Sequence, residues 1–257
     1  MGYVYDTLRG MGAIKARPSG TAYLVNAMKN ANGEVAAESV AELTAQEAEL
    51  IAFKLDRMAP AGLNPVIPAM VARNYETLCV LVQRVKKETS GVFSGMKAVG
   101  NELDFGWLIP QMVGDTSFLN KDSTGSCGLW AGTSAQVYVW EHSFTTAGTV
   151  ENMIPTQTTT QYCGALHMGL ATTIDNPKGD FIRFTMAGQA MPDQSLQQLK
   201  MAYKPSASAA VAMEFEYPVY VGPLTTELIS VEPNLTSGAD ALQLLSIVVA
   251  QASVLSN

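Results

Sequence analysis

Apolar residues in the first ninety positions recur at spacings of three and four, which is the period of one buried face of an α-helix. The clearest run lies between Asn64 and Gly91, and its apolar positions are Ile67, Met70, Val71, Tyr75, Leu78, Leu81, Val82 and Val85. Two shorter runs, over residues 19–33 and 43–62, share this period. The pattern predicts a helical N-terminal region over residues 1–90, with the basic cluster Arg84–Lys87 in the last turn of the third helix.

From residue 91 onward, apolar and polar residues alternate in short runs that are separated by glycine, proline, serine and threonine. One run places Tyr138, Trp140, His142 and Phe144 on a single face, and another does the same for Met213, Phe215, Tyr217, Val219 and Val221. We therefore expect a β-rich domain over residues 91–257, with one short helix within residues 193–204. The apolar run that begins at Ala241 fits either a strand or a helix.

The two patterns together predict an α+β protein, in which an N-terminal helical segment precedes a mainly antiparallel β domain. A β domain of about this length fits a jelly-roll-like sandwich. The alternative is a mixed α+β shell fold of the tailed-phage type, in which helices and sheets are interleaved.

Charge is scarce and unevenly distributed along this chain. Only 15% of the residues are charged, against roughly 25% in an average soluble domain. Residues 1–100 carry 11 Lys/Arg and 9 Asp/Glu, whereas residues 101–257 carry 5 and 14. We expect direct nucleic-acid binding to be weak or absent, because phosphate recognition needs clustered cations.

The terminal segments predict a protein made in the cytoplasm without a membrane span. The N-terminus lacks a basic segment followed by an apolar one, so we expect no secretory signal. The longest apolar run, residues 241–255, is too short and too polar to cross a bilayer. The three cysteines, Cys79, Cys127 and Cys163, are too few for a disulfide scaffold.

Cys127 is the strongest candidate for a nucleophile, since small residues surround it and His142 follows fifteen positions later. A nucleophilic thiol needs a nearby base and a lowered pKa. The flanking Gly125, Gly128 and Gly132 indicate a turn, and alternation puts His142 on an aromatic strand face. We interpret Cys127 as a turn or buried cysteine, with catalysis as the alternative.

Two further groups of residues are candidates for a functional site. Cys127, His142, Cys163 and His167 could ligate zinc, but they lack the closely spaced cysteine pair of structural zinc modules. Glu214 and Glu216 could act as paired carboxylates, but alternation on one strand explains them better. The sequence therefore predicts no catalytic residue, no metal ligand and no cofactor.

These features favour a structural protein that assembles with copies of itself, such as a capsid or coat subunit of a virion, over an enzyme. Low surface charge and abundant Thr, Ser and Gly fit a protein whose surface is covered by partner subunits. One alternative is a hydrolase that uses Cys127 or carboxylates. Another is a carbohydrate-binding β-sandwich module in which exposed Trp107, Trp130 or Trp140 stacks on a sugar.

Overall fold

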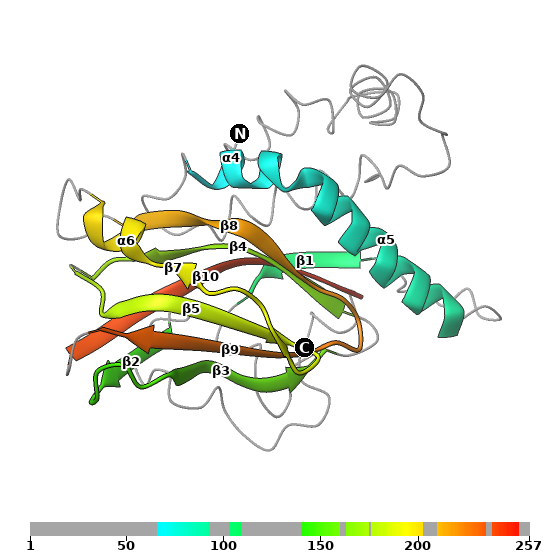
Figure 1. Cartoon of the computed structure of the whole chain (residues 1–257). Coiled ribbons are helices and arrows are strands. Elements are labelled where there is room, and N and C mark those ends of the chain that lie inside the picture. Colours follow the sequence, from blue (N-terminus) through cyan, green and yellow to red (C-terminus); the bar gives the residue numbers. More distant parts are fainter. Residues whose placement is uncertain are drawn as a thin grey trace.

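The computed structural model describes residues 66–92, 103–108, 140–159, 163–174, 176–202, 210–234 and 238–251. These residues form two antiparallel sheets that face each other, with a few helices (Figure 1). The helices are α4 (Val66–Arg73), α5 (Tyr75–Val92) and α6 (Gln197–Met201). The strands are β1 (Leu103–Trp107), β2 (Trp140–Phe144), β3 (Glu151–Thr158), β4 (Cys163–Thr172), β5 (Gly179–Met186), β6 (Gln189–Ala190), β7 (Gln194–Ser195), β8 (Val211–Val221), β9 (Thr226–Pro233) and β10 (Gly238–Gln251).

Each sheet joins strands that are distant in the sequence. Sheet A has the order β1-β10-β4-β8, and β2 pairs with the first part of β10 on the same edge as β1. Sheet B has the order β3-β9-β5-β6, and β7 also pairs with β5. Every strand pair is antiparallel, as the alternating sequence pattern predicted.

The core between the two sheets is built from the inward positions of the alternating strands. In β8 these are Met213, Phe215, Val219 and Val221, which the alternation placed on one face. Phe184 from sheet B meets Phe215 from sheet A edge to face, with ring centroids 5.3 Å apart. The inter-sheet core therefore confirms the face assignment for these four residues, whereas Tyr217, which was predicted on the same face, is half-buried and lies outside this core.

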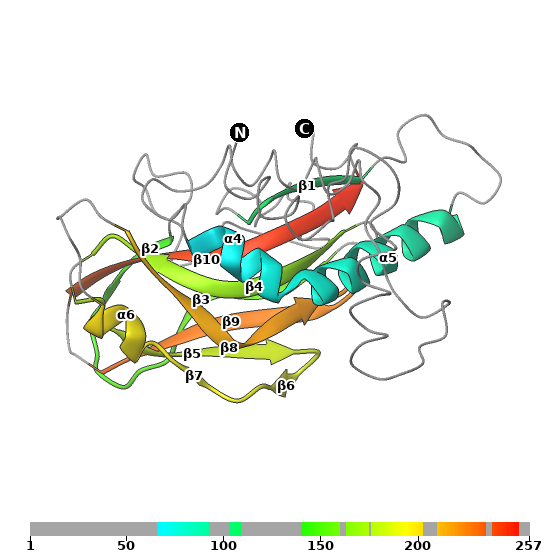
Figure 2. The ribbon, with the colours of Figure 1, turned by 90° about the horizontal axis from the view of Figure 1, so that it is seen from above.

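Helix α5 lies along the outer face of sheet A (Figure 2) and creates a second core there. The predicted apolar face is buried at Met70, Val71, Tyr75, Leu78, Leu81, Val82 and Val85, and Cys79, which was not assigned to that face, is buried with them. They pack against outward residues of sheet A, including Leu166, Leu245 and Ile247. Sheet A is therefore buried on both faces, which explains why every residue of β4 is buried.

The helical stretch is divided at Asn74, between α4 and α5, which the spacing of apolar residues did not predict. The Asn74 side chain donates from Nδ2 to the backbone oxygen of Met70 at 2.9 Å, and so competes for a helical acceptor. The predicted position of the basic cluster was also wrong. Because α5 continues to Val92, Arg84 lies before the last turn, and that turn holds no basic residue. The predicted helices over residues 19–33 and 43–62 lie outside the described residues.

Strand β8 bends sharply where it passes β4. His167 pairs with Val219, but Gly169 pairs with Glu214, so residues 215–218 of β8 lie opposite Met168 alone. Pro218 lies within this irregular segment, where its missing N–H breaks no ladder hydrogen bond. The same residue of β4, Met168, is also skipped in the pairing with β10.

Candidate functional site

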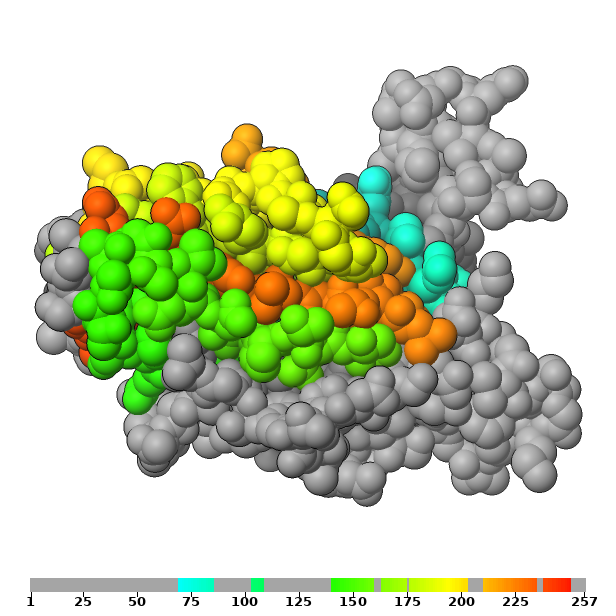
Figure 3. Space-filling view, turned by 60° about the horizontal axis from the view of Figure 1, so that its bottom comes forward, coloured from blue at the N-terminus to red at the C-terminus, as the bar shows by residue number. Residues whose placement is uncertain are grey.

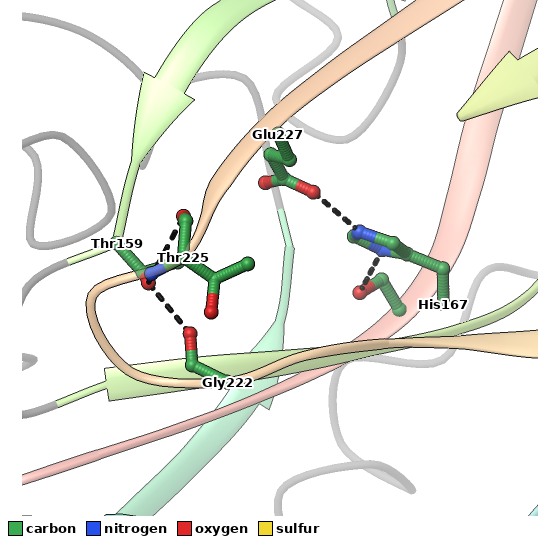
Figure 4. A network of polar contacts seen from close by, with 6 residues as sticks. Thr159, His167, Gly222, Thr225 and Glu227 are labelled. Carbon is green, nitrogen blue, oxygen red and sulfur yellow. Dashed lines mark hydrogen bonds and ion pairs between the residues drawn. The ribbon is translucent and has the colours of Figure 1, made fainter. Parts of the chain in front are cut away.

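The most notable polar cluster lies inside the sandwich, between the two sheets (Figure 4). His167 of β4 contacts Ser246 of the neighbouring β10 through Nδ1, at 2.7 Å from the serine Oγ. Its Nε2 lies 2.9 Å from Oε2 of Glu227, which belongs to β9 in the opposite sheet. The cluster therefore links sheet A to sheet B through one imidazole ring.

All three side chains are removed from solvent. The exposed fraction is 0% for His167 and Ser246, and 1% for Glu227. With Glu227 ionised, Nε2–H donates to the carboxylate and Nδ1 accepts from the Ser246 hydroxyl, so both ring nitrogens are used. The ring also stacks on Phe184, with centroids 5.5 Å apart. Each polar group thus has the partner that a buried polar group requires.

The turn before Glu227 is fixed by a separate group of hydrogen bonds. The Thr159 hydroxyl donates to the Gly222 backbone oxygen at 2.7 Å and accepts from the Thr225 backbone N–H at 2.9 Å. These contacts, labelled in Figure 4, attach the end of β3 to the β8–β9 turn. Glu227 follows this turn by two residues, so its entry into the core is set by the turn.

A serine, a histidine and a carboxylate in one hydrogen-bonded chain are the components of a hydrolytic triad. Nucleophilic catalysis additionally needs a serine that a substrate can reach, and Ser246 is completely buried between paired strands. The chemistry that this arrangement can perform is therefore structural: it satisfies buried polar groups and orients one sheet on the other.

The second histidine joins the same two sheets nearer the surface. His142 of β2 forms an ion-pair contact with Glu151 of β3, and its side chain is 11% exposed. Its ring also meets Phe144 edge to face, with centroids 5.0 Å apart. His142 is thus the packed strand residue that the alternation predicted.

The residues considered as an alternative zinc site are not brought together where the structure describes them. Cys163 is buried at the start of β4, and both ring nitrogens of His167 are used by Ser246 and Glu227. Within the described parts of the chain, no three His, Cys, Asp or Glu residues are grouped so that they could hold a metal ion. Cys127, the candidate nucleophile, lies outside the described residues.

The two carboxylates of β8 have separate environments. Glu214 accepts from Nδ2 of Asn74 at 3.2 Å and pairs with Arg73, whose pKa is raised by this hydrogen bond. Glu216 is exposed on the same face of the strand. Glu214 therefore attaches α4 to the sheet and does not form a catalytic pair with Glu216.

Loss of the Glu214 contact should have only a small effect. We expect Glu214→Gln to lower the free energy of unfolding by about 1 kcal/mol or less, because Arg73 is largely exposed and the pair is screened by water. Urea unfolding measures this, with Glu216→Gln as the matched control. A loss of several kcal/mol would contradict a screened surface pair.

Two of the three tryptophans named in the carbohydrate-binding alternative are not available for stacking. Trp107 and Trp140 are both 0% exposed and belong to the helix-side and inter-sheet cores, respectively. They are buried because their strands pair with β10 in a sheet covered on both faces. Trp130 lies outside the described residues.

The sequence did not indicate Ser246 or Glu227 as members of a polar cluster. Each lies in a strand with many apolar residues, and they are 79 and 60 residues from His167, respectively. In the sequence, each is recognisable only as a polar residue among the apolar residues of a strand. None of the described helices combines the length and the apolar character that crossing a membrane requires.

Comparisons with known proteins give no family. No protein-family model matches the sequence, and a search of curated proteins finds no match. The structure is similar to part of infectious bursal disease virus, Gx strain, at 8% identity over 44% of this chain and 30% of that chain, with a TM-score of 0.25.

Two other similar structures belong to different kinds of protein. A family 35 carbohydrate-binding module from an environmental isolate matches at 9% identity over 61% of this chain and 93% of that chain, with a TM-score of 0.22. Dimeric latent PorU from Porphyromonas gingivalis matches at 15% identity over 58% of this chain and 12% of that chain, also with a TM-score of 0.22. The chain thus spans less than a third of the viral and PorU chains, and likeness at this level supplies no argument about function.

Proposed function

We propose that this protein is a structural subunit that assembles with copies of itself into a shell, as a virion coat protein does, and that its sandwich is a jelly roll. The observation that carries the proposal is the strand order. If β6 and β7 count as one strand and β2 as the first of eight, sheet A joins strands 1-8-3-6 and sheet B joins strands 2-7-4-5. A chain folded as two Greek keys in a jelly roll has this order.

Jelly rolls serve as capsid subunits, as lectins and as cupins, and the described residues favour the first. A lectin of the kind considered above would need an exposed aromatic platform, whereas Trp107 and Trp140 are buried. A metal-binding cupin interior would need free imidazole ligands, whereas the inward His167 is fully engaged by Ser246 and Glu227. A shell subunit needs neither feature.

The outer face of sheet B supports self-association. In Figure 3, β3, β9 and β5 lie side by side on this face, with none of the described helices over them. Cross-strand polar pairs occupy part of it, including Ser230 with Asn152 and Thr158 with Thr226. Phe181 lies near the start of β5, opposite Glu232 of β9, and is 40% exposed, which gives this face an apolar side chain for a contact with another subunit.

Light scattering on the purified full chain tests the proposal. We expect particles much heavier than the 27.4 kDa chain, with closed shells visible by negative-stain microscopy. A monodisperse monomer at all protein concentrations, salt concentrations and pH values would contradict it. A small oligomer without closed particles would retain self-association and exclude a shell.

A pair of variants at Phe181 tests the sheet B face. Phe181→Asp should reduce assembly, because it places a charge in the middle of the buried contact, and should leave the unfolding transition of the monomer nearly unchanged. Phe181→Tyr is the matched control, since it keeps the ring and should assemble normally. Unchanged assembly of Phe181→Asp would exclude this face as an interface.

A further inference from the structure

A second polar cluster lies at the end of the sandwich where β5 and β10 begin. Lys200 extends from α6, and its Nζ contacts Oδ1 of Asp180 at the start of β5. Asp240, at the start of β10, accepts at Oδ2 from the backbone N–H groups of Lys178 and Gly179, at 3.0 and 2.9 Å. The charge of Asp240 raises the pKa of Lys200, whereas the direct contact of Lys200 Nζ is with Asp180. The cluster therefore gathers an amine and two carboxyl groups from three separate elements.

The Lys200 amine and the Asp180 carboxyl group contact each other where both side chains are largely buried. The exposed fractions of the Lys200 and Asp180 side chains are only 13% and 9%. The backbone N–H of Leu196 donates to the backbone oxygen of Asp180 at 2.7 Å, which fixes the start of α6 against β5. Leu196 and Leu199 are buried in the inter-sheet core, so the short helix that carries Lys200 is anchored on both sides.

The surroundings shift the protonation of this cluster toward neutral groups. Burial lowers the pKa of Lys200, and the charge of Lys178 lowers it further, although Asp240 acts in the opposite direction. Burial raises the pKa of Asp240, against the hydrogen bonds from Gly179, Lys178 and Ala241 and the charge of Lys200. A proton that moves from the ammonium group to Asp240 leaves a nucleophilic amine beside a carboxylic acid.

From this arrangement we propose that Lys200 and Asp180 join covalently in an intramolecular isopeptide bond, with Asp240 transferring the protons. The neutral Nζ of Lys200 attacks Cγ of Asp180, so the Nζ–Cγ bond forms and one Cγ–O bond breaks. The nitrogen gives up two protons, one to Asp240 before the attack and one after it, and both are passed to the departing oxygen. That oxygen therefore leaves as one water molecule, and Asp240 returns to its carboxylate form. The step is a condensation that needs no oxidant, reductant or cofactor.

The fixed contact between Lys200 and Asp180 raises the rate of a condensation that is slow between free molecules. Reacting groups that a protein holds in position behave as if present at effective concentrations of about 10⁵–10⁸ M. The product would connect β5 covalently to α6, near the point where the first residues of sheet A and sheet B meet through Asp240. This inference goes beyond the proposed function and does not depend on it, since a monomer could carry the same bond.

Intact-mass spectrometry of the denatured full chain tests the proposal directly. We expect the wild-type chain to be lighter than its sequence mass by one water molecule. After trypsin digestion, residues 179–183 should remain attached to the peptide that contains Lys200. A folded wild-type chain that keeps its full sequence mass after prolonged incubation at neutral pH would overturn the proposal and leave a salt bridge.

Three variants separate the bond from the ion pair. Lys200→Arg keeps the positive charge but cannot form the amide, so it should have its full sequence mass. Asp180→Asn should lose ammonia in place of water, because the leaving group changes. Asp240→Asn should remain uncrosslinked, and rapid crosslinking in this variant would overturn the role of Asp240.

Discussion

Replacing Glu227 with alanine should lower the free energy of unfolding by about 3 kcal/mol, the largest effect that we expect from any single substitution proposed for this chain. Glu227 is 1% exposed, and its carboxylate meets His167, which is 0% exposed. The variant leaves the imidazole in the inter-sheet core without its charged partner. Removing one member of a buried pair costs more than the pair itself contributes, because the remaining polar group stays desolvated.

Glu232→Ala is the matched control for this variant. Glu232 lies on the same strand, but its side chain is 36% exposed and lies 3.8 Å from Arg183 on the outer face of sheet B. We expect a loss of about 1 kcal/mol or less from this control, as for other surface pairs. Equal urea midpoints for Glu227→Ala and Glu232→Ala would show that the buried cluster does not stabilise the fold.

A double variant separates two possible causes of instability in Glu227→Ala. One is the cost of leaving the His167 side chain buried without a partner, and the other is the loss of the contact between His167 and Glu227 itself. Replacing both His167 and Glu227 with leucine removes both buried polar groups, and such replacements are often neutral or stabilising. We therefore expect the double variant to be more stable than Glu227→Ala alone, although Ser246 then loses its partner. Urea unfolding at constant protein concentration measures the difference.

Gly169→Ala should have the second largest effect. We expect it to lower the free energy of unfolding by about 1–3 kcal/mol, with a value near the upper end of this range. A Cβ atom at this position would overlap the backbone oxygen of Met213 and come within 2.7 Å of the Met70 Cε atom. The methionine side chain can move, but the carbonyl belongs to the paired strand β8 and cannot. The added methyl group would therefore force β8 or α4 away from β4.

Thermal unfolding measures this effect, with Gly222→Ala as the control. At Gly222 the nearest atoms to an added Cβ are Cε1 and the hydroxyl oxygen of Tyr220, at 3.2 and 3.3 Å, and a side chain can shift by that much. We expect a fall in Tm of about 2–4 °C for each kcal/mol in a chain of this size. A Gly169→Ala variant as stable as Gly222→Ala would contradict the close approach of β8 to β4.

Local sequence patterns were sufficient to predict which face of a single helix or strand is buried. The three- and four-residue spacing selected the buried face of α4 and α5, from Met70 to Val85, because a helix repeats every 3.6 residues. Period-two alternation selected most of the inward face of β8. These features depend on neighbours along the chain and so can be read without the fold.

The polar clusters could not be predicted, because each is assembled from distant segments. Glu227 enters the core only since β9 lies opposite β4, and Lys200 meets Asp180 only since α6 packs against the start of β5. The buried state of Trp107 had the same cause. Its strand lies at the edge of β10, beneath α5, and nothing close to Trp107 in the sequence records that neighbour.

The apolar run after Ala241 shows the boundary between the two kinds of information. Its composition determined that the segment is buried, because a run so poor in charge cannot face water. Periodicity could not choose between strand and helix, since a segment that is apolar on every side carries neither a two-residue nor a 3.6-residue period. Tertiary structure made the choice: β4 pairs along one edge of β10 and β1 and β2 along the other, with helix and sheet B covering its faces. Only an extended chain satisfies all of those neighbours at once, because its backbone groups must hydrogen-bond to both sides while its side chains fill both cores.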